Sequence, residues 1–225
     1  MSVSALFLFG SRARGDNSAG SDIDLLAVSN VSEPMVTGAG PATLYHYNSE
    51  WLLSKARQGD LFIWHIVTEA LAVFDPNDVL PELQNEFRFS QNYESQILKG
   101  SEVGWAIASL WGELSAASIN KKLAWSVRTI AIAHAAGSRR PAFSAQALAE
   151  TLDYPNIVSL VGQKDEERLS EKSLTDFVAF LDEFGFSRRC GDISSIDEYT
   201  SYFSDTQNEV GLKLLKLQTS LSSYT

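Results

Sequence analysis

The sequence predicts an α+β fold, in which a small mixed-sheet unit over residues 1–80 precedes an all-α helical bundle over residues 81–225. Two observations support this division. Before Pro81, short apolar runs alternate with turns that contain glycine and proline, which is typical of strands joined by loops. After Pro81, apolar residues recur at spacings of three and four, which is typical of amphipathic helices.

Three strands are expected in the first unit. The apolar run Ala5–Phe9 suits a strand that is buried on both faces of a sheet, and Gly10 ends it. A second strand is predicted over residues 21–29 and a third over residues 42–48. The glycine- and proline-rich segment 30–41 between them is predicted to be a loop.

Helices are expected in both units. Ser49 is a candidate N-cap for a helix that ends at Gly59, and residues 61–76 are expected to form a helix followed by a short strand. The second unit should hold five or six helices. The candidates are residues 94–117, 119–137, 144–152, 165–185 and 205–223.

The composition indicates a folded protein with a substantial core. Hydrophobic residues make up 44% of the chain, which is too much for a disordered protein. The net charge of −10 argues against a protein that binds nucleic acid through its overall charge. The single cysteine, Cys190, excludes an intrachain disulfide, and the first residues lack the features of a secretory signal. We therefore expect a cytoplasmic protein.

The segment LFGSRARGDNSAGSDIDLL, residues 8–26, concentrates the polar chemistry of the first unit. Asp22 and Asp24 alternate with Ile23 and Leu25, so on a strand both carboxylates project from the same face. Such a pair is costly in apolar surroundings unless a cation neutralises it, and Mg²⁺ prefers carboxylate oxygens. The pattern therefore predicts a metal site at Asp22 and Asp24.

The same segment has groups suited to phosphate. The turn at Gly10 and Ser11 offers backbone N–H groups and a hydroxyl, and Arg12 and Arg14 offer positive charge. Metal ions held between carboxylates and phosphates stabilise the attacking and leaving oxygens of an in-line displacement. The segment thus indicates chemistry on a phosphate ester.

The spacing of Gly10-Ser11, ten residues and then Asp22-Ile23-Asp24 resembles the signature of the polymerase-β-type nucleotidyltransferase superfamily. The fuller string GSRARGDNSAGSDIDLL is similar to the minimal nucleotidyltransferase branch of that superfamily. The resemblance implies an NTP donor such as ATP, one or two Mg²⁺ ions or Mn²⁺, and transfer of a nucleoside monophosphate with release of pyrophosphate. It implies catalytic and metal-binding roles for Asp22 and Asp24, and nucleotide binding by Gly10, Ser11, Arg12, Arg14 and Ser21.

One part of the superfamily pattern is missing. A third carboxylate is expected on a following strand, but the segment ATLYHYN at residues 42–48 contains none. Three alternatives stay open. His46 acts as the base, the domain binds a nucleotide without efficient catalysis, or a carboxylate from elsewhere substitutes. The candidates for such a carboxylate are Glu50, Asp60, Glu69 and Asp75.

Two functions follow from these alternatives. The first is an enzyme that transfers a nucleoside monophosphate to a hydroxyl of a protein, a small molecule or an RNA. The second is a catalytically weak nucleotide-binding module, such as the regulatory or antitoxin-like half of a bacterial defence or toxin–antitoxin system. In either case we expect no membrane association. An apolar face of the sheet is expected to be covered by a helix of the second unit, or else by a partner protein or a second copy of the chain.

The helical unit resembles, in layout only, the helical domains that follow this fold in small antibiotic nucleotidyltransferases and in bacterial defence proteins. It is expected to bind the acceptor or to be HEPN-like. Arg128 and His134 fit the loose spacing of the HEPN ribonuclease motif, but their apolar surroundings favour a structural role for His134. Trp105, Trp111 and Trp125 are expected in the core, with base stacking as the alternative.

Overall fold

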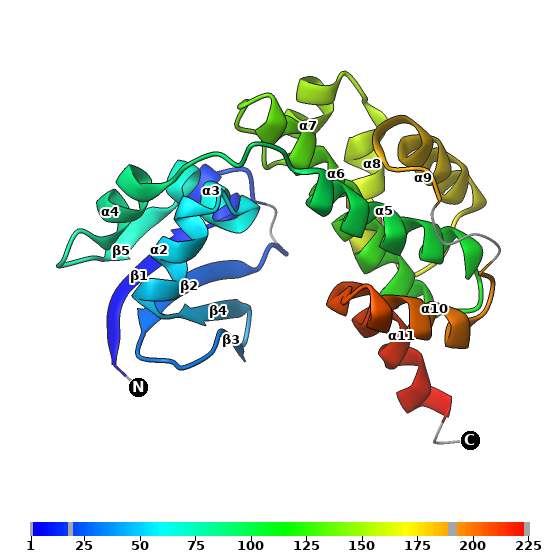
Figure 1. Cartoon of the computed structure of the whole chain (residues 1–225), viewed down its shortest axis with the longest axis horizontal. Coiled ribbons are helices and arrows are strands. Elements are labelled where there is room, and N and C mark those ends of the chain that lie inside the picture. The colour runs from blue at the N-terminus through cyan, green and yellow to red at the C-terminus, as the bar shows by residue number, and fades with distance from the viewer. Residues whose placement is uncertain (1, 18–19, 189–192, 223–225) are drawn as a thin grey trace. The chain divides into compact units, whose positions relative to one another are not determined.

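The computed structural model describes residues 2–17, 20–188 and 193–222 (Figure 1). Cys190 lies outside the described residues. The chain forms two compact units, Met1–Asn92 and Tyr93–Thr225. Among the described residues, no helix has both the length and the apolar character that crossing a membrane requires.

The first unit extends beyond the boundary predicted at residue 80. Helix α4 (Val79–Glu86) belongs to it, because Leu83 is fully buried in its core. The N–H of Arg88 then donates to the carbonyl of Ala56 at 3.0 Å, which ties the following segment to the same unit. Pro81 does not end the unit, since proline is tolerated in the first turn of a helix, where its missing N–H would have no partner.

A five-stranded mixed sheet forms the base of this unit. Its strands are β1 (Val3–Phe9), β2 (Ile23–Ser29), β3 (Met35–Ala39), β4 (Ala42–Tyr47) and β5 (Leu71–Phe74), in the order β3-β4-β2-β1-β5. Strand β1 runs antiparallel to β2 and β5, β3 runs antiparallel to β4, and β2 and β4 are parallel. The three predicted strands and the short strand after residue 70 are therefore confirmed.

Strand β3 contradicts the loop predicted over residues 30–41. The glycines of this segment indicated a loop. Because β3 is an edge strand, Gly38 lowers its stability less than a glycine in the centre of a sheet would. The two residues between β3 and β4 form the tight connection of a hairpin, and Gly40 adopts the positive φ of 59° that this turn uses.

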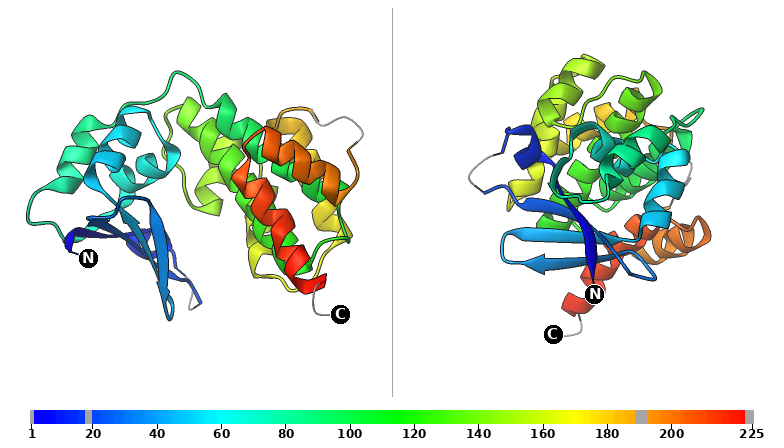
Figure 2. Two further views of the ribbon diagram at one scale, coloured as in Figure 1. Left: turned by 60° about the horizontal axis from the view of Figure 1, so that its bottom comes forward. Right: turned by 90° about the vertical axis from the view of Figure 1, so that its left-hand side faces the viewer.

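Three helices cover one face of the sheet, α2 (Ser49–Arg57), α3 (Leu61–Glu69) and α4, as Figure 2 shows. The core between them is apolar because alternate strand residues such as Phe7 and Leu26 point toward Leu52 and Ile63. Each side chain of this size stabilises the fold by about 1.5–3 kcal/mol when it is fully buried. The cap of α2 is Asn48 rather than the predicted Ser49, since the Asn48 side chain accepts from the N–H of Trp51 at 2.7 Å.

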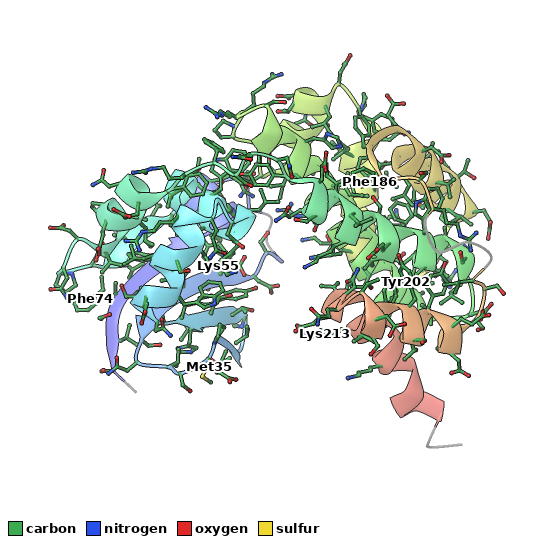
Figure 3. The ribbon with its side chains drawn as sticks, viewed as in Figure 1. Met35, Lys55, Phe74, Phe186, Tyr202 and Lys213 are labelled. Carbon is green, nitrogen blue, oxygen red and sulfur yellow. The ribbon has the colours of Figure 1, made fainter. Side chains whose placement is uncertain are left out.

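The opposite face of the sheet is also apolar. The strand register places Leu8 beside Leu25 and Leu71 on this face, and Leu6 beside Phe74. Exposure is greatest on the edge strands, where Leu71 and Phe74 on β5 are about half exposed and Met35 on β3 is 38% exposed (Figure 3). This face is consistent with the predicted need for a covering partner.

The second unit is helical. Helices α5 and α6 pack together and form the centre of its core, with buried residues such as Ile107, Leu123 and Ile130. The helices are α5 (Glu94–Ser109), α6 (Ala116–Gly137), α7 (Ala145–Leu152), α8 (Asn156–Gly162), α9 (Glu171–Phe184), α10 (Ile196–Asp205) and α11 (Glu209–Ser222).

Two of these helices lie outside the predicted set, and one prediction was too long. The helix predicted to run to residue 117 ends at Ser109, before a turn in which Gly112 has a φ of 86°. Helix α8 was missed because it has only seven residues. Helix α10 begins with a capping box between Ser195 and Glu198, and the spacing of these two residues is the sequence signal for its start.

Gly59 provides a test of the first unit's extent. An added Cβ at Gly59 would lie 2.4 Å from the backbone nitrogen of Ser90 and 2.6 Å from the carbonyl oxygen of Arg88, and φ is 71°. We expect Gly59→Ala to lower the free energy of unfolding by about 3 kcal/mol, measured by urea denaturation. Gly15→Ala is the matched control, because φ is 79° but no atom lies within 4 Å, so only about 1 kcal/mol should be lost. Equal losses would contradict the packing of residues 88–90 on this unit.

Candidate functional site

The site begins where β1 turns away from the sheet. Phe9, the last residue of β1, pairs with Asp24 on β2, so Asp24 lies beside the turn that follows. Gly10 in this turn has a φ of 76°, and an added Cβ would lie 2.9 Å from Oδ2 of Asp24. Glycine is therefore required here for two reasons, the positive φ and the close approach of the carboxylate. Helix α1 (Ser11–Arg14) is the single helical turn that follows.

The carboxylates of Asp22 and Asp24 act on one neighbouring group. Asp24 shares a face with Phe9 and with Thr43 of β4, which is the face that the helices cover. Burial raises the pKa of Tyr45, and the charges of Asp24 and Asp22 raise it further. Both aspartates therefore act electrostatically on the same phenol.

Arg12 fixes the backbone that leads into β2. Its Nη2 donates to the carbonyl of Ser21 at 2.8 Å, and its Nε lies 3.3 Å from the carbonyl oxygens of Ser21 and Asp22. The guanidinium therefore links α1 to the residue that carries the first carboxylate. The resemblance implies that Arg12 binds phosphate. Only the N–H groups that do not bind these carbonyls could do so.

Arg14 forms ion pairs with two acidic side chains. Its Nε lies 3.0 Å from Asp16, and its Nη1 lies 2.5 Å from Oε1 of Glu69 on α3. His65 also contacts Glu69, and its ring packs edge-on against Phe9 with 5.6 Å between ring centroids. The guanidinium of Arg14 is thus largely committed to protein carboxylates, and His65 has the paired, packed environment of a core histidine.

The structure gives other roles to most candidates for a third carboxylate. Asp60 caps α3 by accepting from the N–H groups of Phe62 and Ile63. Asp75 accepts from the backbone at the start of α4, and Glu69 is paired with Arg14. Glu50 is exposed in the first turn of α2. If Asp60 or Asp75 moved to the candidate site, the backbone N–H groups that it accepts from would lose their partner.

His46 faces away from the aspartates. It pairs with Ala27, which lies on the face opposite to Asp24, and its Nε2 lies 3.0 Å from Oγ1 of Thr37. The structure therefore contradicts a role for His46 as the base beside Asp24. The β4 residues on the side of Asp24 are Thr43 and Tyr45 instead. Tyr45 was missed in the sequence, although the alternation within ATLYHYN could have placed it there.

Asp22 and Asp24 fit a magnesium ion that a nucleotide helps to hold. Within the described residues there is no cluster of three or more His, Cys, Asp or Glu side chains suited to a metal ion. Mg²⁺ is commonly held by one or two carboxylates together with water and substrate phosphates rather than by an all-protein cage. Two carboxylates two residues apart, of which Asp24 lies against the turn at Gly10, suit such a shared site.

Residues 1–99 match the family model of the nucleotidyltransferase domain. The match supports a nucleotidyltransferase domain in this part of the chain. The predicted membership of the nucleotidyltransferase superfamily is thus confirmed, and it agrees with the mixed sheet and with the glycine turn against Asp24. No curated protein matches the chain.

The helical unit that follows the nucleotidyltransferase domain gives His134 a structural role. Its Nε2 lies 2.8 Å from the carbonyl oxygen of Phe184, and the two rings pack edge to face. Arg128 and His134 are six residues apart on α6, which separates their directions by about 120° around a helix of 3.6 residues per turn. They therefore do not project from one face of α6, as a shared phosphate site would require.

The phenols beside the site predict a loss of stability in alkali. The pKa of Tyr45 and of Tyr47 is raised above 10, chiefly by burial. The folded protein then keeps these protons to higher pH than the unfolded chain, so the free energy of unfolding should fall as pH rises above about 10. Urea denaturation at a series of pH values measures this slope. The double variant Tyr45→Phe, Tyr47→Phe should have a shallower slope, and an identical slope would contradict the prediction.

Proposed function

We propose that this protein is a Mg²⁺-dependent nucleotidyltransferase that moves a nucleoside monophosphate from an NTP to an acceptor hydroxyl and releases pyrophosphate. The observation that carries the proposal is the packing of the Asp24 carboxylate against the α-carbon of Gly10, with Asp22 two residues before it. Membership of the nucleotidyltransferase domain family supports nucleotidyl transfer in general. The donor, the metal and the residue roles are parts of the proposal.

Each part of the site has a proposed task. Asp22 and Asp24 are the catalytic carboxylates and would hold one or two Mg²⁺ ions, or Mn²⁺, which offset the charge of the triphosphate. Gly10 and Ser11 would hold the phosphates through backbone N–H groups and the hydroxyl. Arg12 holds the Ser21–Asp22 backbone in place, and Arg14 keeps α1 against Glu69.

The proposed reaction exchanges one phosphorus–oxygen bond for another. The acceptor oxygen forms a bond to the α-phosphorus of the NTP while the bond to the pyrophosphate oxygen breaks, and the acceptor loses its proton. The site would orient the α-phosphate for in-line attack, which lowers the entropic part of the barrier. The acceptor is a protein, a small molecule or an RNA, and the charge of −10 makes a long RNA the least favoured.

The setting of the reaction is also part of the proposal. We place the protein in the cytoplasm on the evidence of its single cysteine. The half-exposed Leu71 and Phe74 on the edge strand β5 favour a second copy or a partner protein on the apolar face of the sheet. Sedimentation should then show a species larger than the monomer at micromolar concentration.

A second function is favoured by a specific observation. The β4 residues beside Asp24 are Thr43 and Tyr45, so β4 offers no carboxylate to activate an acceptor. Such a domain suits a nucleotide-binding regulatory module, as in the antitoxin-like half of a bacterial defence pair. This candidate predicts NTP binding with Mg²⁺ but no pyrophosphate release in the presence of any cell extract.

Asp24→Asn tests the enzyme proposal directly. Replacing one carboxylate removes a metal ligand and should lower pyrophosphate release by roughly 100-fold or more, since several kcal/mol of charge stabilisation are lost. The assay uses the full chain, labelled NTPs and cell lysate, and records whether label enters protein, RNA or small molecules. Asp205→Asn, at the exposed end of α10, is the matched control and should keep full activity. Turnover unchanged by Asp24→Asn would contradict the proposed site.

Gly10→Ala tests the contact on which the site is built. The added Cβ would lie 2.9 Å from Oδ2 of Asp24, so the carboxylate must move and Mg²⁺-dependent NTP binding should weaken by at least tenfold. Calorimetry with NTP and Mg²⁺ measures this effect. Gly15→Ala has a similar positive φ but no atom within 4 Å, so it should retain binding. Equal effects of the two substitutions would show that strain in the turn matters and the Asp24 contact does not.

A further inference from the structure

The helical unit contains a cavity of about 330 Å³ that neither the family nor the proposed function assigns. It lies among α5, α6 and the turn between α10 and α11, and its volume is at the lower end of the range for small-molecule sites. All of its lining residues belong to the second unit. We propose that this cavity binds a nucleoside monophosphate, with the base against Trp125 and the phosphate near Lys99.

The floor of the cavity combines an aromatic ring with polar groups. Trp125 and Thr129 of α6 and Gln96 of α5 line it, and all three are partly buried. Within the described part of the chain, the indole N–H of Trp125 and the hydroxyl of Thr129 have no protein hydrogen-bond partner. A ring with polar donors beside it suits a planar heteroaromatic ligand, because nucleobases stack on aromatic side chains and form hydrogen bonds at their edges.

Three lysines lie on or near the cavity, and one of them, Lys213, is 4.0 Å from the carboxylate of Glu209, which also lines it. Lys99 lies on the exposed rim, Lys122 is one turn before Trp125 on α6, and Lys213 projects from α11 (Figure 3). Lys122 is half-buried, and both its burial and the charge of Lys213 lower its pKa. Glu209 offsets the charge of Lys213, so Lys99 and Lys122 are the ammonium groups that favour a ligand with a phosphate.

The rim also has groups that match the edge of a base. Gln207 and Glu209 line the cavity from the turn between α10 and α11. An amide both donates and accepts hydrogen bonds, and a carboxylate accepts from an exocyclic amine. A volume of about 330 Å³ suits a single nucleotide rather than a length of nucleic-acid strand. A single nucleotide fits the volume of the cavity, and its phosphate and base match the positive and negative groups of the lining.

A buried polar network holds this wall in place. Asn208 is 1% exposed, and its amide donates to the carbonyl of Lys99 at 3.3 Å and to Glu102 at 3.0 Å. Its side-chain oxygen accepts from the N–H of Gly211, and the hydroxyl of Tyr202 donates to Glu102 at 2.8 Å. The turn that carries Gln207 and Glu209 is thus fixed to α5, so the cavity is preformed, which limits the entropy lost when a ligand binds.

Calorimetry of the full chain with each of the four common nucleoside monophosphates tests this inference. The titrations use Asp24→Asn protein in a metal chelator, so the result does not depend on the proposed catalytic site. We expect one-to-one binding of at least one monophosphate and weaker binding of the matching nucleoside. Trp125→Leu should weaken binding about tenfold or more through loss of stacking. Lys99→Ala should weaken the monophosphate but not the nucleoside.

Controls separate a local effect from unfolding. Lys121→Ala changes an exposed lysine on α6 outside the cavity and should leave binding unchanged. Trp125→Phe keeps a ring and should restore most of the binding lost in Trp125→Leu, and thermal melting followed by circular dichroism checks each fold. Absence of binding at millimolar concentrations of all four monophosphates would overturn the inference. Binding that survives both Trp125→Leu and Lys99→Ala would also overturn it.

Discussion

The candidate site depends on one close contact, that between the Asp24 carboxylate and the α-carbon of Gly10. The contact needs the antiparallel pairing of Phe9 with Asp24, which brings the end of β1 beside the start of β2. It also needs a residue without a side chain at a φ of 76°. Because an aspartate approaching a backbone turn this closely leaves no room for a Cβ, the turn and the carboxylate form one unit. Arg12 completes this unit by binding the carbonyls of Ser21 and Asp22.

Both arginines of α1 are bound by other groups of the protein. Arg14 binds the carboxylates of Asp16 and Glu69. The guanidinium of Arg14 thereby neutralises structural carboxylates, and that of Arg12 binds carbonyls. Under the proposed function, the charges of Asp22 and Asp24 are the ones that a divalent cation would neutralise. These contacts leave Arg12 and Arg14 fewer N–H groups for a phosphate than the sequence alone suggests.

The sequence predicted the features that local pattern controls. Alternation in SDIDLL placed Asp22 and Asp24, and the apolar run Ala5–Phe9 gave β1, because both signals follow from side-chain direction along a strand. Strand β3 was not predicted, because glycine lowers strand propensity. Its position at the edge of the sheet is what allows a glycine there. The roles of Asp60 and Arg14 escaped for another reason. A cap or an ion pair depends on which backbone or carboxylate the fold brings near, and the spacing of charges does not encode it.

The register of β4 determines what the acceptor side of the site offers. Parallel pairing places Thr43 beside Asp24 and His46 beside Ala27, and a shift of one residue would exchange the two faces of β4. Two interactions oppose that shift, the contact of His46 with Thr37 and the packing of the Tyr45 ring against Phe9 at 5.5 Å. The phenol of Tyr45, whose pKa is raised, stays protonated near neutral pH. In the proposed reaction it would donate a hydrogen bond to an acceptor or phosphate oxygen and would not take the acceptor's proton, so the proposal requires a base from outside β4.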